Sequence, residues 1–316
     1  MGAVESRAIR FHENGDPLEV LREERVEVPD PGEGKVRVRV VATGLNPADW
    51  ELCRGVLPGT LPRGIGYDVA GTVDAVGEGV EDVTVGDLVF GVADYTAQPS
   101  AGAADHAVLR LWFAVPAGLD AVHAAVLPMV VQTAHWTLDL MDLRPGETVL
   151  VHGAGGMVGY AAVQIALRRG ARVVATAGPT FAPDLEAFGA AVTAYGEGMA
   201  GRVRSLVHGP IDHVLDVSRP NAGAIAALAE IAGDPRRVVT ISNHDEAHRL
   251  GARVNIDELR ASGRVPSSDM LADYAALATT GEFAIPVART FPLDEWRAAA
   301  ELSLSGAPHG KVVLVP

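Results

Sequence analysis

The chain has 316 residues, 48% of them hydrophobic and 21% charged, which is enough for about two domains with buried cores. Its formal net charge is −14, which argues against nucleic-acid binding, because that function needs a basic surface. Cys53 is the single cysteine, so the chain can form neither an intramolecular disulfide nor a thiolate-rich zinc site. No stretch is apolar for long enough to suggest a membrane span. We expect a cytoplasmic protein, and the dominance of Arg over Lys is typical of a GC-rich bacterial genome.

The first third of the chain is predicted to form short strands. Valines alternate with arginines over residues 36–40, the pattern of a half-buried strand, and residues 69–76 and 87–91 are similar. Glycines separate these segments and favour tight turns. Together they predict a compact domain resembling a β-barrel.

From about residue 120 the pattern changes to alternating helices and strands. Residues 121–140 are apolar at helical spacing. Further helices are predicted over 158–169, 183–188 and 222–232, and strands over 148–152, 172–177, 211–217 and 237–241. Strands and helices that alternate at these lengths predict βαβ units and a parallel sheet. From about residue 283 the pattern returns to strand, helix and strand.

A glycine-rich turn over residues 153–159 is the strongest local motif. It follows a predicted strand and opens a predicted helix, as a dinucleotide-binding turn must. Small residues would let the backbone approach a pyrophosphate, which the helix N-terminus attracts. The pattern has Ala154 where the first glycine is usual, so a purely structural tight turn is the alternative.

The end of the next strand favours NADPH over NADH. Thr176, Ala177 and Gly178 stand where an NAD enzyme would place an acidic residue to bind the ribose hydroxyls. The support is incomplete, because no Lys or Arg lies between Gly178 and Ala200, and Asp184 and Glu186 are close by. NADH remains the alternative cofactor.

Several ordered motifs resemble one known family from end to end. They are Asn46-Pro47-Ala48-Asp49, Gly66-Tyr67-Asp68-Val69-Ala70-Gly71, Val76-Gly77-Glu78-Gly79-Val80, Val85-Gly86-Asp87, Gln132-Thr133-Ala134, the run from Gly146 to Ala154, and His309-Gly310-Lys311-Val312-Val313-Leu314. With these motifs the chain resembles the medium-chain dehydrogenase/reductases, and within them the zinc-free quinone oxidoreductases related to zeta-crystallin.

The resemblance implies an α/β protein of two domains. A GroES-like β-barrel catalytic domain would comprise residues 1–122 and 283–316, and a Rossmann domain with a doubly wound parallel sheet residues 123–282. Family members are usually dimers or tetramers, so a homo-oligomer is expected, with a homodimer as the first expectation. Where zinc-dependent relatives place metal ligands, this chain has Asn46, Tyr67 and a residue near Pro128 or Met129, so no metal is expected.

The resemblance and the residue chemistry suggest five catalytic candidates. Asn46 and Thr133 match family residues beside the nicotinamide, and Tyr67 could donate a proton from its phenol. Glu51 stands where some relatives have a tyrosine, and His135 is close to Thr133 in sequence, so either could act as an acid or base. The alternatives are a turn cap for Asn46, core packing for Tyr67, a helix-internal Thr133, a solvated Glu51 and helix packing for His135.

A second set of residues is expected to contact the cofactor. The resemblance places some at the pyrophosphate and others at the adenosine phosphate or at the carboxyl ends of strands, where parallel sheets bind ligands. They are Gly155, Gly156, Met157, Val158, Thr176, Tyr195, Ser218, Ile241, Ser242 and Lys311. Lys311 could instead be structural.

The sequence therefore predicts an NADPH-dependent oxidoreductase that transfers hydride to an activated C=C bond or a quinone. A substrate already polarised in this way needs no strong Lewis acid. Two alternatives stay open. One is a redox-neutral cyclase or lyase with Glu51 or His135 as its acid–base group, and the other is an NADP-binding protein without catalysis.

Overall fold

The computed structural model describes residues 2–57, 59–95, 99–207, 209–263, 266–306 and 308–316, which form two compact units. Unit 1 comprises residues 1–129 and 269–316, and unit 2 comprises residues 130–268. These limits differ from the expected 122/123 and 282/283. One reason is that helix α11 (Met270–Thr279), expected in the nucleotide-binding domain, contacts strand β7 of unit 1.

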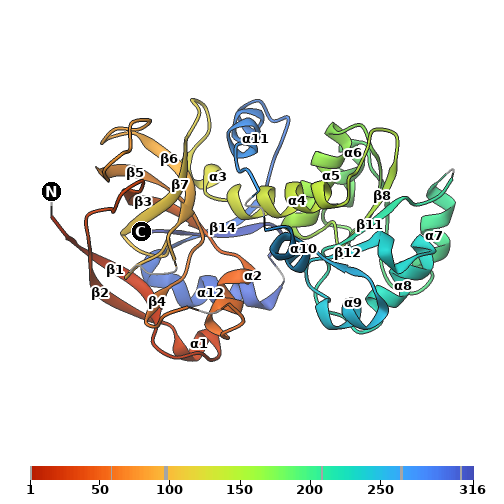
Figure 1. The fold of residues 1–316 in the computed structure, drawn as a ribbon, viewed down its shortest axis with the longest axis horizontal. Helices are drawn as coiled ribbons and strands as arrows, with labels where there is room; N and C mark the ends of the chain where they lie inside the picture. Colours follow the sequence, from red (N-terminus) through yellow and green to blue (C-terminus); the bar gives the residue numbers. More distant parts are fainter. Residues whose placement is uncertain (1, 58, 96–98, 208, 264–265, 307) are drawn as a thin grey trace. The chain divides into compact units, whose positions relative to one another are not determined.

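Most strands of unit 1 pair antiparallel, and several of them close into a ring (Figure 1). In the described residues β3, β5, β6 and β7 pair in that order, and β7 pairs back onto β3. Its strands are β1 (Val4–Phe11), β2 (Arg22–Val28), β3 (Val36–Gly44), β4 (Arg63–Gly64), β5 (Asp68–Val76), β6 (Leu88–Ala93), β7 (His106–Ala114), β14 (Val287–Pro292) and β15 (Lys311–Val315). Its helices besides α11 are α1 (Pro17–Val20), α2 (Pro47–Cys53), α3 (Ala121–Ala124) and α12 (Trp296–Ser305), with a short 3-10 turn at Leu293–Glu295. The ring confirms the GroES-like barrel.

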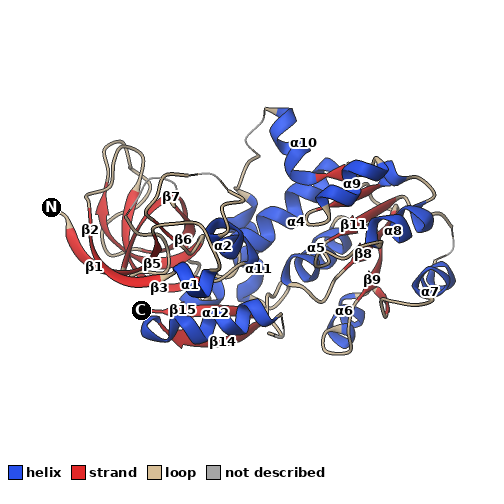
Figure 2. Ribbon diagram, turned by 90° about the horizontal axis from the view of Figure 1, so that it is seen from below, coloured by secondary structure: helices blue, strands red, loops and turns tan. Residues whose placement is uncertain are grey.

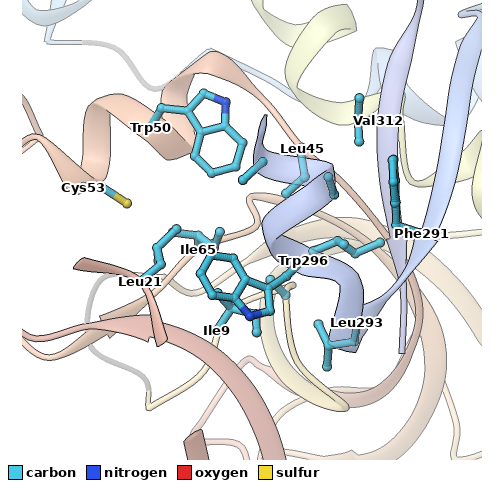
Figure 3. Close-up of a cluster of buried hydrophobic side chains, with 14 of the residues drawn as sticks. Ile9, Leu21, Leu45, Trp50, Cys53, Ile65, Phe291, Leu293, Trp296 and Val312 are labelled. Atoms are coloured by element: carbon cyan, nitrogen blue, oxygen red, sulfur yellow. The ribbon is translucent and has the colours of Figure 1, made fainter. Parts of the chain in front are cut away.

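Segments from the first and the last parts of the chain pack together in the core of unit 1. Helix α12 contacts both β14 and β15, and β15 pairs with β3 (Figure 2). Trp50 of α2 and Trp296 of α12 belong to the same buried cluster (Figure 3). The Trp50 Nε1 also donates a hydrogen bond to Ser303 Oγ of α12 at 3.0 Å. This packing holds the residues between β3 and α2 in place, including Asn46.

Unit 2 contains a six-stranded parallel sheet in the described residues, with the strand order β10-β9-β8-β11-β12-β13. This is the order of the doubly wound nucleotide-binding sheet, so the Rossmann prediction is confirmed. The strands are β8 (Thr148–His152), β9 (Arg172–Thr176), β10 (Ala191–Thr193), β11 (His213–Asp216), β12 (Val238–Thr240) and β13 (Arg253–Val254). The helices are α4 (Pro128–Leu140), whose first two residues belong to unit 1, α5 (Met157–Arg168), α6 (Ala182–Phe188), α7 (Met199–Leu206), α8 (Ala224–Ala232), α9 (His244–Leu250) and α10 (Asn255–Ser262), with a 3-10 turn at Pro235–Arg237.

One long helix expected over residues 121–140 is two helices in the structure. Helix α3 ends at Ala124, and α4 begins at Pro128. Proline has no backbone N–H and disfavours a helical residue before it, so it is tolerated only in the first turn of a helix. The apolar spacing hid this break because residues on both sides of it are buried.

Candidate active site

The glycine-rich turn joins β8 to α5 in unit 2, and its glycines fall into two classes. A Cβ atom on Gly159 would lie 2.7–2.8 Å from Gly153 O, Ala154 Cα and Val217 Cγ2, so this glycine is needed for packing. A Cβ on Gly155 would meet no described heavy atom nearer than Gly178 N at 4.0 Å, apart from its chain neighbours. The absence of a side chain at Gly155 is therefore not required by the fold.

The N-terminus of α5 lies at the same place. Gly156 is its N-cap residue and has no side chain to bond the first backbone N–H groups of the helix. These groups have no partner within a helix and carry its positive dipole end. Met157 and Val158 form the first turn. Open space above uncapped N–H groups is the geometry that binds phosphate oxygens.

The structure places Thr176 beneath this turn. Its hydroxyl oxygen accepts the Gly153 N–H at 3.1 Å and lies 2.8 Å from His152 Nδ1. Thr176 is fully buried, and burial lowers the pKa of His152, which favours the neutral ring. Thr176 therefore fixes the shape of the turn, because its hydroxyl contacts Gly153 and His152. Its contact with the adenosine phosphate stays a prediction.

A pocket of about 380 Å³ lies beyond the ends of β9 and β10. It is lined by Ala177, Gly178, Pro179, Ala182, Glu186, Val192, Thr193, Ala194 and Tyr195. Tyr195 is 62% exposed, so its ring is accessible to a ligand. Glu186 contributes a carboxylate to the lining and no Lys or Arg does, which leaves the choice between NADPH and NADH open.

Behind this lining lies a cation that the sequence did not suggest. Arg202 of α7 donates from Nε to Thr193 Oγ1 at 3.1 Å and from Nη2 to Ala194 O at 2.9 Å. It thus supports the wall that also carries Tyr195. The chain turns after β10 and brings Arg202 back to this strand. No sequence motif joins Arg202 to Thr193, so sequence reasoning did not find it.

The ends of β11 and β12 carry a second polar network. Fully buried Asp216 accepts hydrogen bonds from Ser218 Oγ and Thr240 Oγ1, both at 2.7 Å. Ser242 Oγ donates to Ser218 O at 2.6 Å, and Ile241 N donates to Asp216 O at 3.1 Å. The network brings the expected residues Ser218, Ile241 and Ser242 together. Sequence reasoning missed Asp216, although it is an acidic residue at the end of an apolar strand.

In unit 1 a buried network surrounds Asn46. The Asn46 side-chain nitrogen donates to Gly44 O at 3.1 Å and to Asp68 Oδ2 at 3.0 Å, and its oxygen accepts from Lys311 Nζ at 2.5 Å. Lys311 Nζ is also 3.3 Å from Asp68 Oδ2. Both N–H bonds of the Asn46 amide are thus engaged within the protein, so the amide does not present a free donor to a substrate.

The same network gives Lys311 a structural position. Its side chain is 5% exposed and belongs to β15. Burial raises the pKa of Asp68, and the Lys311 ammonium opposes that shift. A buried carboxylate needs such a partner, which fits the structural alternative for Lys311.

A small pocket of about 30 Å³ in unit 1 includes Tyr67 in its lining. It is lined by Ala48, Asp49, Leu52, Leu57, Tyr67, Tyr95 and Met129, and it has room for a water-sized group. The Asp49 carboxylate accepts the backbone N–H groups of Asn46 and Gly66, both at 2.8 Å. Burial raises the pKa of Asp49 to about 6. A phenol and a carboxyl group with a raised pKa therefore line one mostly apolar pocket.

Of the three further candidates, two lie beside an ionisable partner. Glu51 is 47% exposed and pairs with Arg54 at 2.9 Å, which is the solvated alternative. His135 Nδ1 lies 3.2 Å from Asp139 Oδ2 on α4, one helical turn away. Thr133 is half-buried on the same helix. Glu51 belongs to unit 1, whereas Thr133 and His135 belong to unit 2.

Within the described residues, no group of three or more His, Cys, Asp or Glu side chains is arranged to hold a metal ion. In the same part of the chain no helix is long and apolar enough to cross a membrane.

Comparison with known proteins agrees with this geometry. A family model described as the alcohol dehydrogenase GroES-like domain matches residues 32–119, and one described as zinc-binding dehydrogenase matches residues 188–314. A quinone oxidoreductase from Lama guanicoe is 40% identical over 182 residues, which cover 54% of this chain and 52% of the relative. The chain belongs to the medium-chain dehydrogenase/reductase superfamily.

Two further similar proteins extend the comparison. The spectinabilin polyketide synthase system protein NorB from Streptomyces orinoci is 33% identical over 296 residues, 89% of this chain and 13% of the relative. The solved quinone oxidoreductase from Coxiella burnetii has a TM-score of 0.80 at 24% identity, covering 99% of this chain and all of that one, which shows the shared fold. The chain spans about half the length, or less, of the curated relatives named here.

Superfamily membership implies a nicotinamide cofactor, and unit 2 fits one. The uncrowded Gly155 and the uncapped N-terminus of α5 would hold the pyrophosphate. The pocket beside Gly178 and Tyr195 has a size and place suited to the adenosine end.

Proposed function

We propose that this chain is an NADPH-dependent reductase that transfers hydride, without zinc, to an activated C=C bond or a quinone. One observation carries most of the proposal. Gly155 faces open space at the N-terminus of α5. The packing of unit 2 would admit a side chain there, yet the residue is glycine. A glycine that the fold does not need is explained if a phosphate group approaches the backbone closely.

The choice of NADPH rests on the end of β9. No acidic residue follows this strand directly, because Ala177 and Gly178 line the pocket after Thr176. An NAD enzyme would bind the ribose hydroxyls with a carboxylate at that place. Glu186 lines the same pocket and would repel a 2′-phosphate, so the preference is expected to be moderate.

The proposal of a zinc-free reaction rests on donor chemistry. By resemblance Asn46, Tyr67 and a residue near Met129 stand at the ligand positions of zinc-dependent relatives. A phenol, an amide and a thioether or proline are not the thiolate, imidazole or carboxylate donors that zinc selects. The Asn46 amide is also bonded to Lys311 and Asp68.

The bound nicotinamide would supply the hydride. The remaining chemistry is a proton for the substrate atom that gains negative charge, and a donor that stabilises this charge. Tyr67 lines an apolar pocket and carries a phenolic O–H, so we assign the proton to Tyr67 Oη. Leu52, Leu57 and Met129 would exclude water around it.

The similarity to a polyketide synthase protein favours one substrate class among the three considered. It covers 89% of this chain, whereas the similarity to the Lama guanicoe quinone oxidoreductase covers 54%. We therefore rank α,β-unsaturated thioesters as the first substrates to test, followed by enones and quinones.

The test combines binding, turnover and metal analysis on the purified chain. Fluorescence titration with NADPH and NADH is expected to give tighter binding of NADPH. NADPH oxidation should occur with at least one enoyl thioester, enone or quinone, and should persist after dialysis against a chelator. Tyr67→Phe should retain NADPH binding and lose turnover by roughly 10²-fold. NADPH binding without oxidation by any acceptor would contradict the proposal and favour a redox-neutral or non-catalytic role.

We also propose that the chain forms a homodimer, as expected from the resemblance. Light scattering coupled to size-exclusion chromatography measures the molar mass directly. A monomeric mass near 32.9 kDa would contradict it.

A further inference from the structure

Two tyrosines and one arginine form a cluster beside the small pocket of unit 1. The rings of Tyr67 and Tyr95 are 5.5 Å apart between centroids and inclined by 51°. The guanidinium carbon of Arg110 lies 6.0 Å from the centroid of each ring. Both tyrosines line the pocket. A cation therefore lies next to the phenol to which we assign the proton.

The sheet brings these residues together. Strand β6 lies between β5 and β7, with Asp68 opposite Val92 and Val92 opposite Leu111. Tyr67 precedes Asp68 and Arg110 precedes Leu111, so both lie at the same level of the sheet. No sequence motif joins Tyr67 to a residue 43 positions later, and only the register does.

Arg110 keeps its positive charge available for this cluster. Several other arginines, such as Arg7 and Arg253, form ion pairs with carboxylates. Arg110 takes part in none of the ion pairs between described residues, so no carboxylate neutralises its charge there. A guanidinium stays protonated at all ordinary pH values and can both stack on an aromatic ring and donate hydrogen bonds.

A phenol in a mostly apolar pocket is by itself a poor proton donor. Burial raises the pKa of Tyr67, and Arg110 opposes that shift through its charge and a side-chain hydrogen bond. Loss of the proton leaves a phenolate, and a nearby cation stabilises the phenolate more than the phenol. Arg110 would therefore act mainly on the state that follows proton donation.

We propose that Arg110 is a positioning residue that holds the Tyr67 phenol and stabilises its phenolate when Tyr67 donates a proton to the reduced substrate. This inference rests on the proposed function. For a conjugated thioester or enone, the bound NADPH would supply hydride to the β-carbon and be oxidised to NADP⁺, and the π electrons of the substrate move to form an enolate. The Tyr67 O–H bond then breaks, and its proton bonds to the enolate. The electron pair stays on Tyr67 Oη beside Arg110, and a proton taken up from the solvent restores the phenol, so each turnover consumes one hydride and one solvent proton.

A double-mutant cycle tests whether Arg110 acts through Tyr67. Arg110→Met should lower kcat by about tenfold with little change in KM, and Arg110→Lys, which keeps a charge, should restore part of the loss. In the Tyr67→Phe background, Arg110→Met should change kcat by less than about twofold. Equal losses in both backgrounds, or no loss in the parent chain, would overturn the proposal.

A second measurement needs no substrate. In protein with isotope-labelled tyrosine, the Tyr67 ring signal is assigned by its disappearance in Tyr67→Phe. Arg110→Met should shift this signal. Arg289→Met is the matched control, because Arg289 also stacks on a ring, that of Phe291 at 4.4 Å. A Tyr67 signal unmoved by Arg110→Met would overturn the inference independently of any turnover, whereas failure of NADPH oxidation in the parent chain would concern the proposed function.

Discussion

Alanine at two glycines of the same turn is expected to affect stability in one case and cofactor binding in the other. At Gly159 the new Cβ would lie 2.7–2.8 Å from Gly153 O, Ala154 Cα and Val217 Cγ2, two of them backbone atoms that cannot move aside easily. Such overpacking costs about 1–3 kcal/mol, and the gain in helix propensity offsets about 1 kcal/mol of it. Because two of the three close atoms are backbone, we expect a cost in the upper half of this range, and therefore a net loss of about 1–2 kcal/mol of stability for Gly159→Ala.

At Gly155 the balance is reversed. The nearest described atom to the new Cβ is Gly178 N at 4.0 Å, and Gly155 is not among the residues with positive φ. Alanine there should leave the fold intact and stabilise it by about 0.4–1 kcal/mol through the unfolded chain. It would obstruct one phosphate contact, worth about 1.5–3 kcal/mol, so the Kd for NADPH should rise about tenfold or more.

Thermal unfolding by circular dichroism and fluorescence titration with NADPH measure the two effects separately. Gly159→Ala should lower Tm by roughly 2–4 °C per kcal/mol lost. Gly155→Ala should keep or raise Tm. The reasoning is refuted if Gly155→Ala binds NADPH as tightly as the parent chain, or if Gly159→Ala unfolds at the parent temperature.

Three other predictions concern charges. Glu186→Gln removes a carboxylate from the adenosine-side pocket, so the Kd for NADPH should fall by about two- to fivefold while that for NADH, measured by the same calorimetric titration, stays constant. Burial raises the pKa of Asp49 from 3.8 to about 6, so the stabilisation present below pH 3.8 is lost as the pH rises through about 6. The free energy of unfolding, measured in urea, should fall between these pH values in the parent chain and change less in Asp49→Asn. An equal pH dependence of the unfolding free energy in both proteins would show this reasoning to be wrong. Lys311→Met leaves buried Asp68 without its cation and should cost about 3–5 kcal/mol in urea unfolding, most of it recovered by adding Asp68→Asn, and a double variant as unstable as the single one would contradict this account.

The location of the phosphate-binding turn was predictable because its evidence is local. The strand before it, the glycines and the helix after it lie within residues 148–168, and the structure has β8 and α5 there. Alternation of strands and helices similarly predicted the parallel sheet, since each βαβ unit is continuous in sequence. The break before Pro128 was missed because apolar spacing alone does not reveal where a buried helix restarts.

The roles of polar side chains were harder to predict, because their partners are distant in the sequence. Thr176 faces Gly153 under the turn, and Lys311 reaches Asn46 from the other end of the chain. Whether a hydroxyl or an ammonium group is open to a ligand depends on these partners. Sequence position alone identified such residues as candidates but did not show which of their donors are already engaged.

The amino-acid sequence by itself determined the two-part architecture, the phosphate-binding turn and the superfamily, because hydrophobic period and turn chemistry act over a few neighbouring residues. Only the tertiary structure decided that Asn46 is bonded to Lys311 and Asp68, and that Arg110 lies beside Tyr67. Hydrogen bonding and charge act over a few ångströms in space, and the sheet register brings together residues that the chain separates by tens or hundreds of positions.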